Sequence, residues 1–380
     1  MTDAAANGPL AGLRILDLSV TLPGPFCTQA LADLGAQVTK IEPPAGDMTR
    51  QSPTGIFHVA NRNKQSVVLD LKTPEGVRAC RGLAAQSDVA VEGFRPGVVD
   101  RLGVGYSELR RVKPDIVYCS ISGYGQSGPL AMEPGHDVNY LAAGGALAYS
   151  GQWERSGPQR PALPVADLSA ALYASVAILA ALRRRDATGQ GVHIDIALAD
   201  CAMALASTRA GLNQQMRDDE RRHLFPTNGL FACADGREIA LGVVEDHFWT
   251  ALRSVLDARE PQLAQARFAT EALRRENGDA LASVLRALFL TAPAQEWLML
   301  LSGINVPVSM ALTMPEAVQA PQVRARGLVQ SLDGQRHVTF PALWDGWPVG
   351  RVHSNPPELG EHTAQVLGRL SCADAAITPS

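Results

Sequence analysis

The sequence of 380 residues contains no uninterrupted run of about 18 apolar residues, the length that a membrane-spanning helix requires. Its first residues, MTDAAANGPLAG, lack the charged segment and apolar stretch of a secretory signal peptide, so we expect a cytoplasmic protein. Little net charge is present: 34 Lys and Arg against 38 Asp and Glu give −4 at pH 7. Nucleic-acid binders concentrate basic residues. We therefore expect neither membrane nor nucleic acid as a partner.

Signals for metal sites and disulfides are also missing. The eight histidines form no His-x-His or His-x-x-x-His pair, and no C-x-x-C occurs, so we expect no bound metal. Aromatic residues make up only 5% and hydrophobic residues 46%, which is an ordinary globular composition. The length of 380 residues is enough for two or three domains with sizeable buried cores. The widely spaced cysteines are expected to be mostly buried free thiols: Cys27, Cys80, Cys119, Cys201, Cys233 and Cys372.

The first 125 residues alternate short β-rich runs with helical stretches. This alternation predicts an α/β fold in which helices cover a mostly parallel, doubly wound sheet. Thr73-Pro74-Glu75 is typical of a helix start, with a capping threonine, a proline in the first turn and an acid near the positive helix end. The predicted strands are 14–19, 37–42, 66–71, 88–94 and 115–122, and the predicted helices are 25–35 and 73–85.

After Gly128 the pattern changes. Helices are predicted at 138–148, 167–185 and 199–216, with a strand at 191–198 and a charged segment at 217–223. The helix at 167–185 is apolar nearly all round, so protein must cover most of it, either its own core or a second subunit. A strand pair around Ala234–Gly236 followed by helices predicts a smaller α+β domain at 224–321. We expect the large domain to span 1–215 and to be completed by the Pro- and Gly-rich segment 322–380, packed across its surface.

The segment Gly123–Gly128, GYGQSG, matches the G-x-G-x-x-G pattern of dinucleotide-binding folds and follows a predicted strand. That function requires a helix to begin there, so that its amides meet a pyrophosphate. Pro129 and Pro134 are incompatible with an ordinary helix start. We therefore predict a tight loop at the carboxyl edge of the sheet, where ligands of α/β proteins bind, and no NAD site.

Basic residues gather near the ends of the early strands. Any one of them is most simply a solvated surface charge, but together they could recognise a phosphorylated ligand. Arg62 and Arg95 stand out because turn residues flank them. The full set is Arg14, Lys40, Arg50, Arg62, Lys64, Lys72, Arg95 and Arg101.

Two further residues are candidates for acid–base chemistry. His136 lies in a loop between the glycine turn and a helix start, where it could carry a proton near pH 7 or donate a structural hydrogen bond to a carbonyl. Asp167 opens the long apolar helix, where the simplest role is an N-cap. An aspartate among apolar residues can also have an altered proton affinity that suits catalysis.

Several segments together resemble the CoA-transferase family III, of the formyl-CoA and carnitine CoA-transferase type, which also contains α-methylacyl-CoA racemases. They include PGPFCTQALADLGAQVTKIEPPAGD, NRNKQSVVLDLKTPEG, VEGFRPGVVDRLGVGY and GHDVNY. The resemblance implies a Rossmann-like large domain, a smaller domain and an interlocked homodimer. It implies an acyl-CoA thioester substrate and no permanently bound cofactor. By motif position it assigns a coenzyme A site to Leu69, Lys72, Gly93, Phe94, Arg95 and Arg101.

The family carries two chemistries. Its transferases use an aspartate at the position of Asp167 as a nucleophile, forming an acyl anhydride and an enzyme-bound CoA thioester. Its racemases use a histidine and that aspartate on opposite sides of the acyl C2, with a glutamate near the histidine. His136 and Glu245 match the racemase pattern, so the resemblance favours a 2-methylacyl-CoA racemase, with CoA transfer through Asp167 as the alternative. Against this pattern, Leu168-Ser169 replaces the glycine-rich stretch of racemases, and the NRNK segment is similar to transferases.

Overall fold

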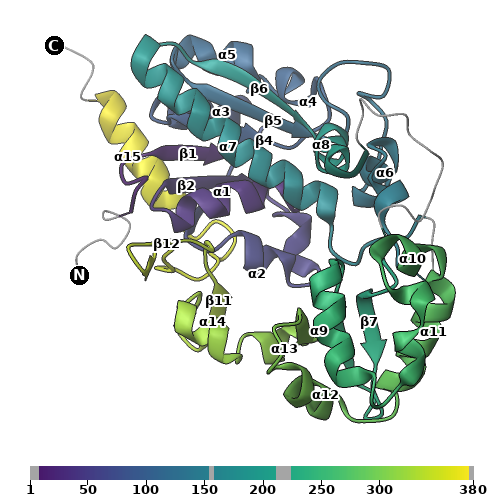
Figure 1. Cartoon of the computed structure of the whole chain (residues 1–380). Helices are drawn as coiled ribbons and strands as arrows, with labels where there is room; N and C mark the ends of the chain where they lie inside the picture. The colour runs from purple at the N-terminus through teal and green to yellow at the C-terminus, as the bar shows by residue number, and fades with distance from the viewer. Residues whose placement is uncertain (1–7, 154–157, 211–223, 376–380) are drawn as a thin grey trace. The chain divides into compact units, whose positions relative to one another are not determined.

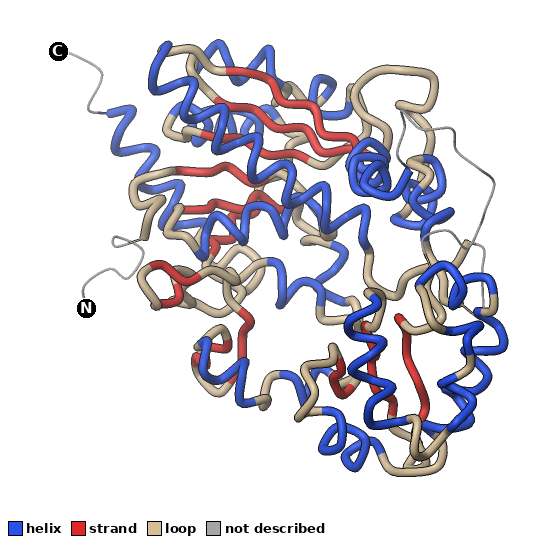
Figure 2. The backbone as a smooth tube through the Cα atoms, viewed as in Figure 1, coloured by secondary structure: helices blue, strands red, loops and turns tan. Residues whose placement is uncertain are grey.

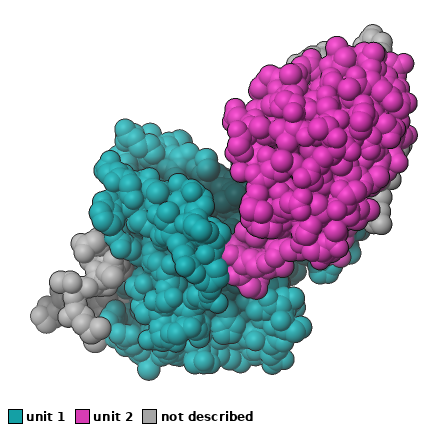
Figure 3. Space-filling view, turned by 60° about the horizontal axis from the view of Figure 1, so that its bottom comes forward, with its two compact units in different colours: residues 1–145, 162–206, 318–380 teal, residues 146–161, 207–317 magenta. Residues whose placement is uncertain are grey.

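The computed structural model describes residues 8–153, 158–210 and 224–375. The chain divides into two compact units, which Figure 3 distinguishes by colour. The first contains residues 1–145, 162–206 and 318–380, and the second contains residues 146–161 and 207–317. Each unit has its own buried core, so each is described in turn.

A six-stranded parallel sheet organises the first unit. Its strands run in the order β3-β2-β1-β4-β5-β6, which is the order of a Rossmann-type doubly wound sheet. The predicted α/β class is therefore confirmed. The strands are β1 (Arg14–Asp17), β2 (Gln37–Glu42), β3 (Lys64–Val68), β4 (Val89–Glu92), β5 (Val117–Ser122) and β6 (Val192–Ala197).

Strand β3 begins and ends earlier than the sequence indicates. The predicted strand ran to Leu71, but Asp70 starts a turn in which its carbonyl accepts a hydrogen bond from the Thr73 amide at 3.0 Å. The Asp70 carboxylate also accepts from the Lys72 amide at 2.9 Å. These local bonds compete with the strand ladder and end it at Val68.

Helices cover both faces of the sheet. Figure 1 shows α1 and α7 crossing one face, where they pack against each other, while α3 and α5 pack together on the other. The Thr73 hydroxyl accepts from the Gly76 amide at 3.1 Å, so the predicted cap of α3 is confirmed. The helices are α1 (Pro23–Asp33), α2 (Ile56–Ala60), α3 (Pro74–Ala85), α4 (Val98–Arg101), α5 (Tyr106–Val112), α6 (Asp137–Ala143), α7 (Val165–Thr188) and α8 (Leu198–Ala210), with a 3₁₀ turn η2 at Met48–Gln51.

Two predicted helices differ in length from those observed. The helix expected at 138–148 is split into α6 and a 3₁₀ turn at Ala146–Tyr149, because Gly145 adopts a left-handed conformation with φ of 74°. The described part of α8 ends at Ala210. The remaining predicted helical residues 211–216 and the charged segment 217–223 lie outside the described residues.

The long helix α7 packs on α1, β5 and β6. An 18-residue window of it reaches a mean hydropathy of 1.9, enough for a membrane span by composition, and 44% of that window is buried in the structure. On one side of this helix, Ala170, Ala174 and Ile178 are fully buried. On another side, Leu172 and Val176 are 53% and 65% exposed. One side of the helix therefore belongs to the core and another remains apolar and exposed.

The C-terminal segment contacts the sheet and helices of the first unit. Its backbone amides at Arg351 and His362 donate to the carbonyls of Asp33 and Ser66, at 2.9 and 3.0 Å. Figure 2 shows that much of this segment is loop between short elements. These are α14 (Pro321–Arg326), β10 (Val329–Leu332), β11 (Gln335–Val338), β12 (Leu343–Trp344), β13 (Trp347–Pro348) and α15 (Thr363–Ala375), of which α15 packs on α3 and β3.

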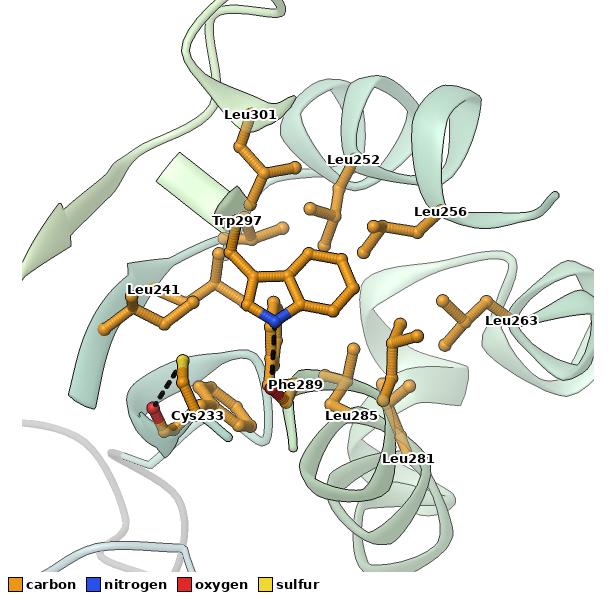
Figure 4. Close-up of a cluster of buried hydrophobic side chains, with 14 of the residues drawn as sticks. Cys233, Leu241, Leu252, Leu256, Leu263, Leu281, Leu285, Phe289, Trp297 and Leu301 are labelled. Carbon is orange, nitrogen blue, oxygen red and sulfur yellow. Dashed lines mark hydrogen bonds between the residues drawn. The ribbon is translucent and has the colours of Figure 1, made fainter. Parts of the chain in front are cut away.

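The second unit combines a three-stranded antiparallel sheet, in the order β7-β8-β9, with helices. Its core surrounds Trp297, whose indole Nε1 donates to the Phe289 carbonyl at 2.8 Å (Figure 4). Trp153 joins this unit through an indole hydrogen bond of 2.9 Å to Asp279. The elements are β7 (Asn228–Ala232), β8 (Glu238–Gly242), α9 (Asp246–Leu256), α10 (Glu271–Glu276), α11 (Gly278–Phe289), α12 (Ala294–Leu301), β9 (Val308–Met310) and α13 (Met314–Ala317), with 3₁₀ turns at Ala146–Tyr149, Pro261–Ala264 and Ala266–Phe268.

Trp297→Ala is expected to lower the free energy of unfolding of the second unit by about 3–5 kcal/mol, because a fully buried aromatic side chain leaves a cavity. Met299→Ala on the same helix is the matched control, since Met299 is 64% exposed and should have little effect. Chemical denaturation followed by far-ultraviolet circular dichroism measures the stability of both variants, because this signal does not depend on tryptophan fluorescence. Equal destabilisation by the two substitutions would contradict the described core.

Five of the six cysteines are buried free thiols, as expected: Cys27, Cys80, Cys119, Cys201 and Cys233. Burial raises the pKa of the Cys27 and Cys80 thiols to about 12, so neither is a ready nucleophile. The side chain of Cys372 lies outside the described residues.

Candidate functional site

A cavity of about 430 Å³ lies in the first unit, lined by the loops that follow β4 and β5 and by the start of α6. The order of the sheet reverses between β1 and β4, and ligands of open α/β sheets bind outside the carboxyl ends of strands at such a point. A volume of this size suits a small-molecule site. The wall consists of Gly93, Phe94, Arg95, Pro96, Ser122, Gly123, Ala131, Glu133, Pro134, Gly135, His136, Asn139 and Tyr140.

The ring of Tyr140 shapes one side of this cavity. Its hydroxyl donates to the Gly135 carbonyl at 2.7 Å, and the ring meets that of Tyr124 edge-on at 5.2 Å. A Cβ at Gly123 would lie 2.4 Å from the Tyr140 ring, so this position requires glycine. No helix begins in the glycine segment, which forms the predicted loop at the carboxyl edge of the sheet. The signature therefore serves close packing, and the rejection of a dinucleotide helix start is confirmed.

His136 lies immediately before α6 and is exposed on the cavity wall. Its backbone amide donates to the Asn139 side chain at 3.0 Å, which fixes the start of the helix. The next residue, Asp137, is 7% exposed and reaches a different helix. The segment from Gly135 to Asp137 thus joins the cavity to the beginning of α7.

Asp167 is the third residue of α7, so the expectation that it caps this helix is wrong. Pro164 occupies the cap position, and Asp137 supplies the missing acceptor from outside the helix. Its Oδ1 accepts from the amides of Ala166 and Asp167, at 2.7 and 3.2 Å. Capping from another segment leaves the Asp167 carboxyl available for chemistry.

Burial, and then the nearby charge of Asp137, raise the pKa of Asp167 to about 7. Burial, followed by the charges of Asp167 and Tyr124, raises the pKa of Tyr140, so Asp167 lies close enough to influence a residue of the cavity wall. Asp167 itself is not among the residues that line the cavity. A half-buried carboxyl that titrates near neutrality beside a cavity is a candidate nucleophile or acid–base group.

The residues assigned to coenzyme A by resemblance fall into two groups. Gly93, Phe94 and Arg95 line the cavity, directly after β4. Leu69 is 6% exposed in the core, while Lys72 and Arg101 are exposed charges of the same unit outside the cavity wall.

The prediction that these cations together bind a phosphorylated ligand is wrong for five of them. Arg14 begins β1, at the end of the sheet opposite the cavity. The other four form ion pairs with internal carboxylates, which neutralise them: Lys40 with Asp47 at 3.0 Å, Arg50 with Glu42 at 2.7 Å, Arg62 with Asp33 at 2.6 Å and Lys64 with Asp17 at 2.9 Å.

The Asn61–Lys64 segment is instead a structural clamp. Asn63 donates to the Arg351 carbonyl at 2.6 Å and accepts from the amides of His353 and Ser354. Arg62 pairs with Asp33 and also donates to the Val338 carbonyl at 2.9 Å. These polar residues hold the C-terminal segment against the rest of the first unit, which explains their burial.

Glu245 lies in the second unit, exposed at the start of α9. Buried Arg274 fixes its neighbours, donating to the Val244 carbonyl at 3.1 Å and to the Asp246 carboxylate at 2.7 Å. The backbone at Glu245 is therefore held on both sides by one guanidinium.

Comparison with known proteins adds independent information. A model of CoA-transferase family III matches residues 10–363. The succinyl-CoA:glutarate CoA-transferase of Mus musculus is 33% identical over 96% of this chain and 87% of its own length. The acetyl-CoA:oxalate CoA-transferase of Acetobacter aceti is 34% identical over 98% of this chain and 99% of its own. A crystal structure of a CaiB/BaiF family protein from Brucella suis superposes with a TM-score of 0.86 at 31% identity, covering 96% and 100% of the two chains.

The chain belongs to CoA-transferase family III. The family indicated by the sequence motifs is thus confirmed, and coenzyme A enters as part of a thioester substrate. These relatives are named as transferases and not as racemases, so the comparisons favour the alternative interpretation over the racemase-like branch.

Sequence reasoning about this family III protein missed two contributors to the site. Asp137 supplies the acceptor that frees Asp167, and Tyr140 forms a wall of the cavity. Both belong to the GHDVNY segment, in which only His136 was predicted as a site residue. An acid that caps a helix 30 residues away has no local sequence signal, whereas an aromatic residue near two glycines does indicate close packing.

Proposed function

We propose that this protein transfers coenzyme A between carboxylic acids, with Asp167 as the nucleophile. The observation that supports this most strongly is the Asp167 carboxyl, in the first turn of α7 and released from capping by Asp137. The positive end of a helix favours a nearby carboxylate, and an ionised carboxylate is the attacking species. The named activities of relatives at 33% and 34% identity agree with this chemistry.

In the first half-reaction, a carboxylate oxygen of Asp167 attacks the carbonyl carbon of the acyl-CoA thioester. The C–S bond breaks, CoA leaves as a thiolate, and Asp167 becomes part of a mixed anhydride. The thiolate then attacks the Asp167 carbonyl carbon of that anhydride, which releases the donor acid as a carboxylate. The product is a thioester between Asp167 and CoA, with no net proton consumed.

The second half-reaction reverses this order with a new acid. The acceptor carboxylate attacks the Asp167 thioester, CoA thiolate leaves, and a second anhydride forms. Attack of the thiolate on the acceptor's carbonyl yields the new acyl-CoA and regenerates the Asp167 carboxylate. Amides or hydroxyls that meet the developing oxyanions stabilise each step.

Dicarboxylic acids are the proposed substrates. The relatives act, by their names, on succinyl-CoA and glutarate or on acetyl-CoA and oxalate. Arg95 is a cation on the wall of the cavity, where a guanidinium can bind a carboxylate or a phosphate in a bidentate manner. In the CoA complex, we assign Lys72, Arg95 and Arg101 to the phosphates of the nucleotide, as the family resemblance implies.

A transfer assay with succinyl-CoA and a panel of acceptors tests this function. We expect a new acyl-CoA with at least one of oxalate, glutarate, citramalate or mesaconate, detected by liquid chromatography and mass spectrometry. Acetate and 2-methylbutyrate serve as monocarboxylate comparisons. No new acyl-CoA with any acceptor, from protein that binds CoA, would overturn the proposal.

Asp137→Asn is expected to shift the acid limb of the transfer rate to lower pH. Activity requires ionised Asp167, whose pKa of about 7 means that the rate falls as pH drops through neutrality. Removing the like charge of Asp137 lowers the pKa of Asp167, while the asparagine oxygen can still accept from the two helix amides. The pH profile of kcat/KM measures the shift, and an unchanged acid limb would argue against Asp167 as the titrating group.

Racemisation at C2 is the second candidate, and the position of His136 on the cavity wall is the observation that favours it. In this alternative, neutral His136 removes the α-proton, protonated Asp167 returns one to the other face, and Glu245 has the supporting role that the resemblance implies. Incubation of 2-methylacyl-CoA in D2O would then place deuterium at C2, and His136→Ala would abolish the exchange. We expect instead that His136→Ala retains transfer, while Asp167→Ala does not.

The proposal includes an interlocked homodimer, as the family resemblance implies. Within the first unit, α7 exposes Leu172, Tyr173, Val176 and Leu179, an apolar surface that a second copy would cover. Light scattering is expected to give about twice the chain mass of 40.4 kDa. A monomer across the micromolar range would contradict the dimer, and Val176→Arg is expected to weaken it.

A further inference from the structure

A buried carboxyl immediately precedes the loop that lines the cavity. Glu92 is the last residue of β4 and is 1% exposed. Its Oε2 accepts from the backbone amide of Phe94 at 2.7 Å. Phe94 and its neighbours Gly93 and Arg95 form part of the cavity wall, so Glu92 holds the loop that the ligand would touch.

A chain of hydrogen bonds leads from Glu92 across the sheet. Ser120 lies beside Glu92 on the neighbouring strand, and its hydroxyl is a hydrogen-bond partner of the carboxyl. The same hydroxyl meets His193 Nε2 at 3.0 Å. The His193 ring lies on β6, the edge strand, and stacks on Tyr106 at 5.1 Å. The Ser120 hydroxyl therefore bridges a buried carboxyl and a ring at the edge of the sheet, donating to one and accepting from the other.

Burial and two nearby carboxylates disfavour the ionised form of Glu92. Burial raises the pKa of Glu92 to about 7, and the carboxylates of Asp100 in α4 and Asp195 in β6 add to the rise. The hydrogen bonds from Ser120 and the Phe94 amide oppose it. Burial lowers the pKa of His193, although the nearby carboxylates of Asp195 and Asp100 oppose this shift.

We propose that Glu92 is a positioning residue whose ionisation fixes the Gly93–Arg95 loop, so that the affinity of this site for coenzyme A depends on the protonation of Glu92. An ionised carboxylate makes a charge-assisted bond to the Phe94 amide, about twice as strong as a neutral one. Protonation weakens that bond and loosens the cavity wall. The inference rests on the proposed CoA ligand, but on no particular reaction.

The directions of the hydrogen bonds that link Glu92, Ser120 and His193 depend on the charge of Glu92. When Glu92 is ionised, Ser120 donates to it and the His193 Nε2–H donates to Ser120. When Glu92 is protonated, its own hydroxyl donates to Ser120, which donates to His193. Each of these three side chains keeps its hydrogen bonds in both arrangements, so Glu92 can gain or lose a proton without leaving a donor unpaired.

Equilibrium binding of CoA between pH 6 and 8.5, measured by isothermal titration calorimetry, tests the proposal. We expect Glu92→Gln to weaken binding about fivefold at pH 8 and to have almost no effect at pH 6, because glutamine resembles the protonated acid. The CoA phosphate titrates near pH 6 in both proteins, so it cancels in the comparison. A wild-type pH dependence in Glu92→Gln would overturn the proposal.

Ser120→Ala gives a second test that does not alter the carboxyl. Loss of the Ser120 hydrogen bond removes a stabiliser of the carboxylate, so the midpoint of the affinity profile is expected to move to higher pH. Ser87→Ala is the control, since Ser87 is buried near the amino end of β4 and donates to the Leu83 carbonyl. A uniform loss of affinity at every pH for Ser120→Ala would indicate packing alone and contradict the proposal. Since only CoA binding is measured, absence of transfer activity would affect the proposed function and not this result.

Discussion

Asp167→Asn is expected to lower the rate of CoA transfer by about a thousandfold or more, while CoA still binds. The substitution keeps the size of the side chain and its place in the first turn of α7. An amide cannot form the anhydride or the CoA thioester, so both half-reactions stop at their first step. Steady-state rates with succinyl-CoA and the best acceptor, together with calorimetric CoA binding, measure the two effects.

Asp186→Asn is the matched control, because Asp186 lies on the same helix with its side chain 60% exposed. It should transfer CoA at nearly the wild-type rate. If Asp167→Asn kept a tenth or more of the activity, the carboxyl could not be the nucleophile. If both substitutions abolished activity together with CoA binding, the effect would be structural.

The second large effect concerns stability. Arg62→Met is expected to lower the free energy of unfolding by about 3–5 kcal/mol, because it leaves Asp33 as an uncompensated charge in the core. The Arg62 guanidinium donates to both carboxylate oxygens of Asp33, at 3.0 and 2.6 Å. Asp33 also accepts from the Phe340 amide at 3.1 Å, so the loss would extend to the C-terminal segment. Urea denaturation followed by circular dichroism measures the change.

The comparison for this substitution is Arg78→Met, which breaks an exposed pair with Glu75 on α3 and should leave stability nearly unchanged. The affinity of Arg62→Met for CoA is expected to match that of the wild type at temperatures where the variant is folded. A large loss of CoA affinity without loss of stability would restore Arg62 to the phosphate-binding cluster that the sequence suggested.

The sheet and its helices could be predicted because their signals are local. Short β-branched runs such as QVTKIE, and a start signal such as Thr73-Pro74-Glu75, depend on residues close together in the chain. The strand predicted at 66–71 ends at Val68 because Asp70 makes its own turn. Proline positions likewise excluded a dinucleotide helix without any structural information.

The ion pairs of the buried cations could not be predicted, because each partner carboxylate is distant in sequence. Arg62 and Asp33 are 29 residues apart, and Lys64 and Asp17 are 47 apart. Spacing along the chain places a lysine near the end of a strand but does not show which carboxylate the fold brings to it. The same limit applies to Asp137, whose role as an external cap of α7 depends on a contact over 29 residues.

The chemistry of Asp167 could be only partly predicted. Position at the start of an apolar helix indicated an altered proton affinity, and its pKa of about 7 agrees with that expectation. A carboxyl that titrates near neutrality suits either a nucleophile or an acid, so the residue alone does not distinguish transfer from racemisation. The names of relatives favour transfer, and the two mechanisms leave different covalent products.

Mass spectrometry of the protein after incubation with succinyl-CoA in D2O, without acceptor acid, tests the central claim most directly. We expect a peptide containing Asp167 to carry the mass of CoA, lost on treatment with hydroxylamine and absent from Asp167→Asn, with no deuterium at C2 of the recovered ester. A parallel incubation with 2-methylbutyryl-CoA supplies the racemase substrate class. Deuterium at C2 of that ester, with no CoA adduct on Asp167 from either substrate, would contradict the account.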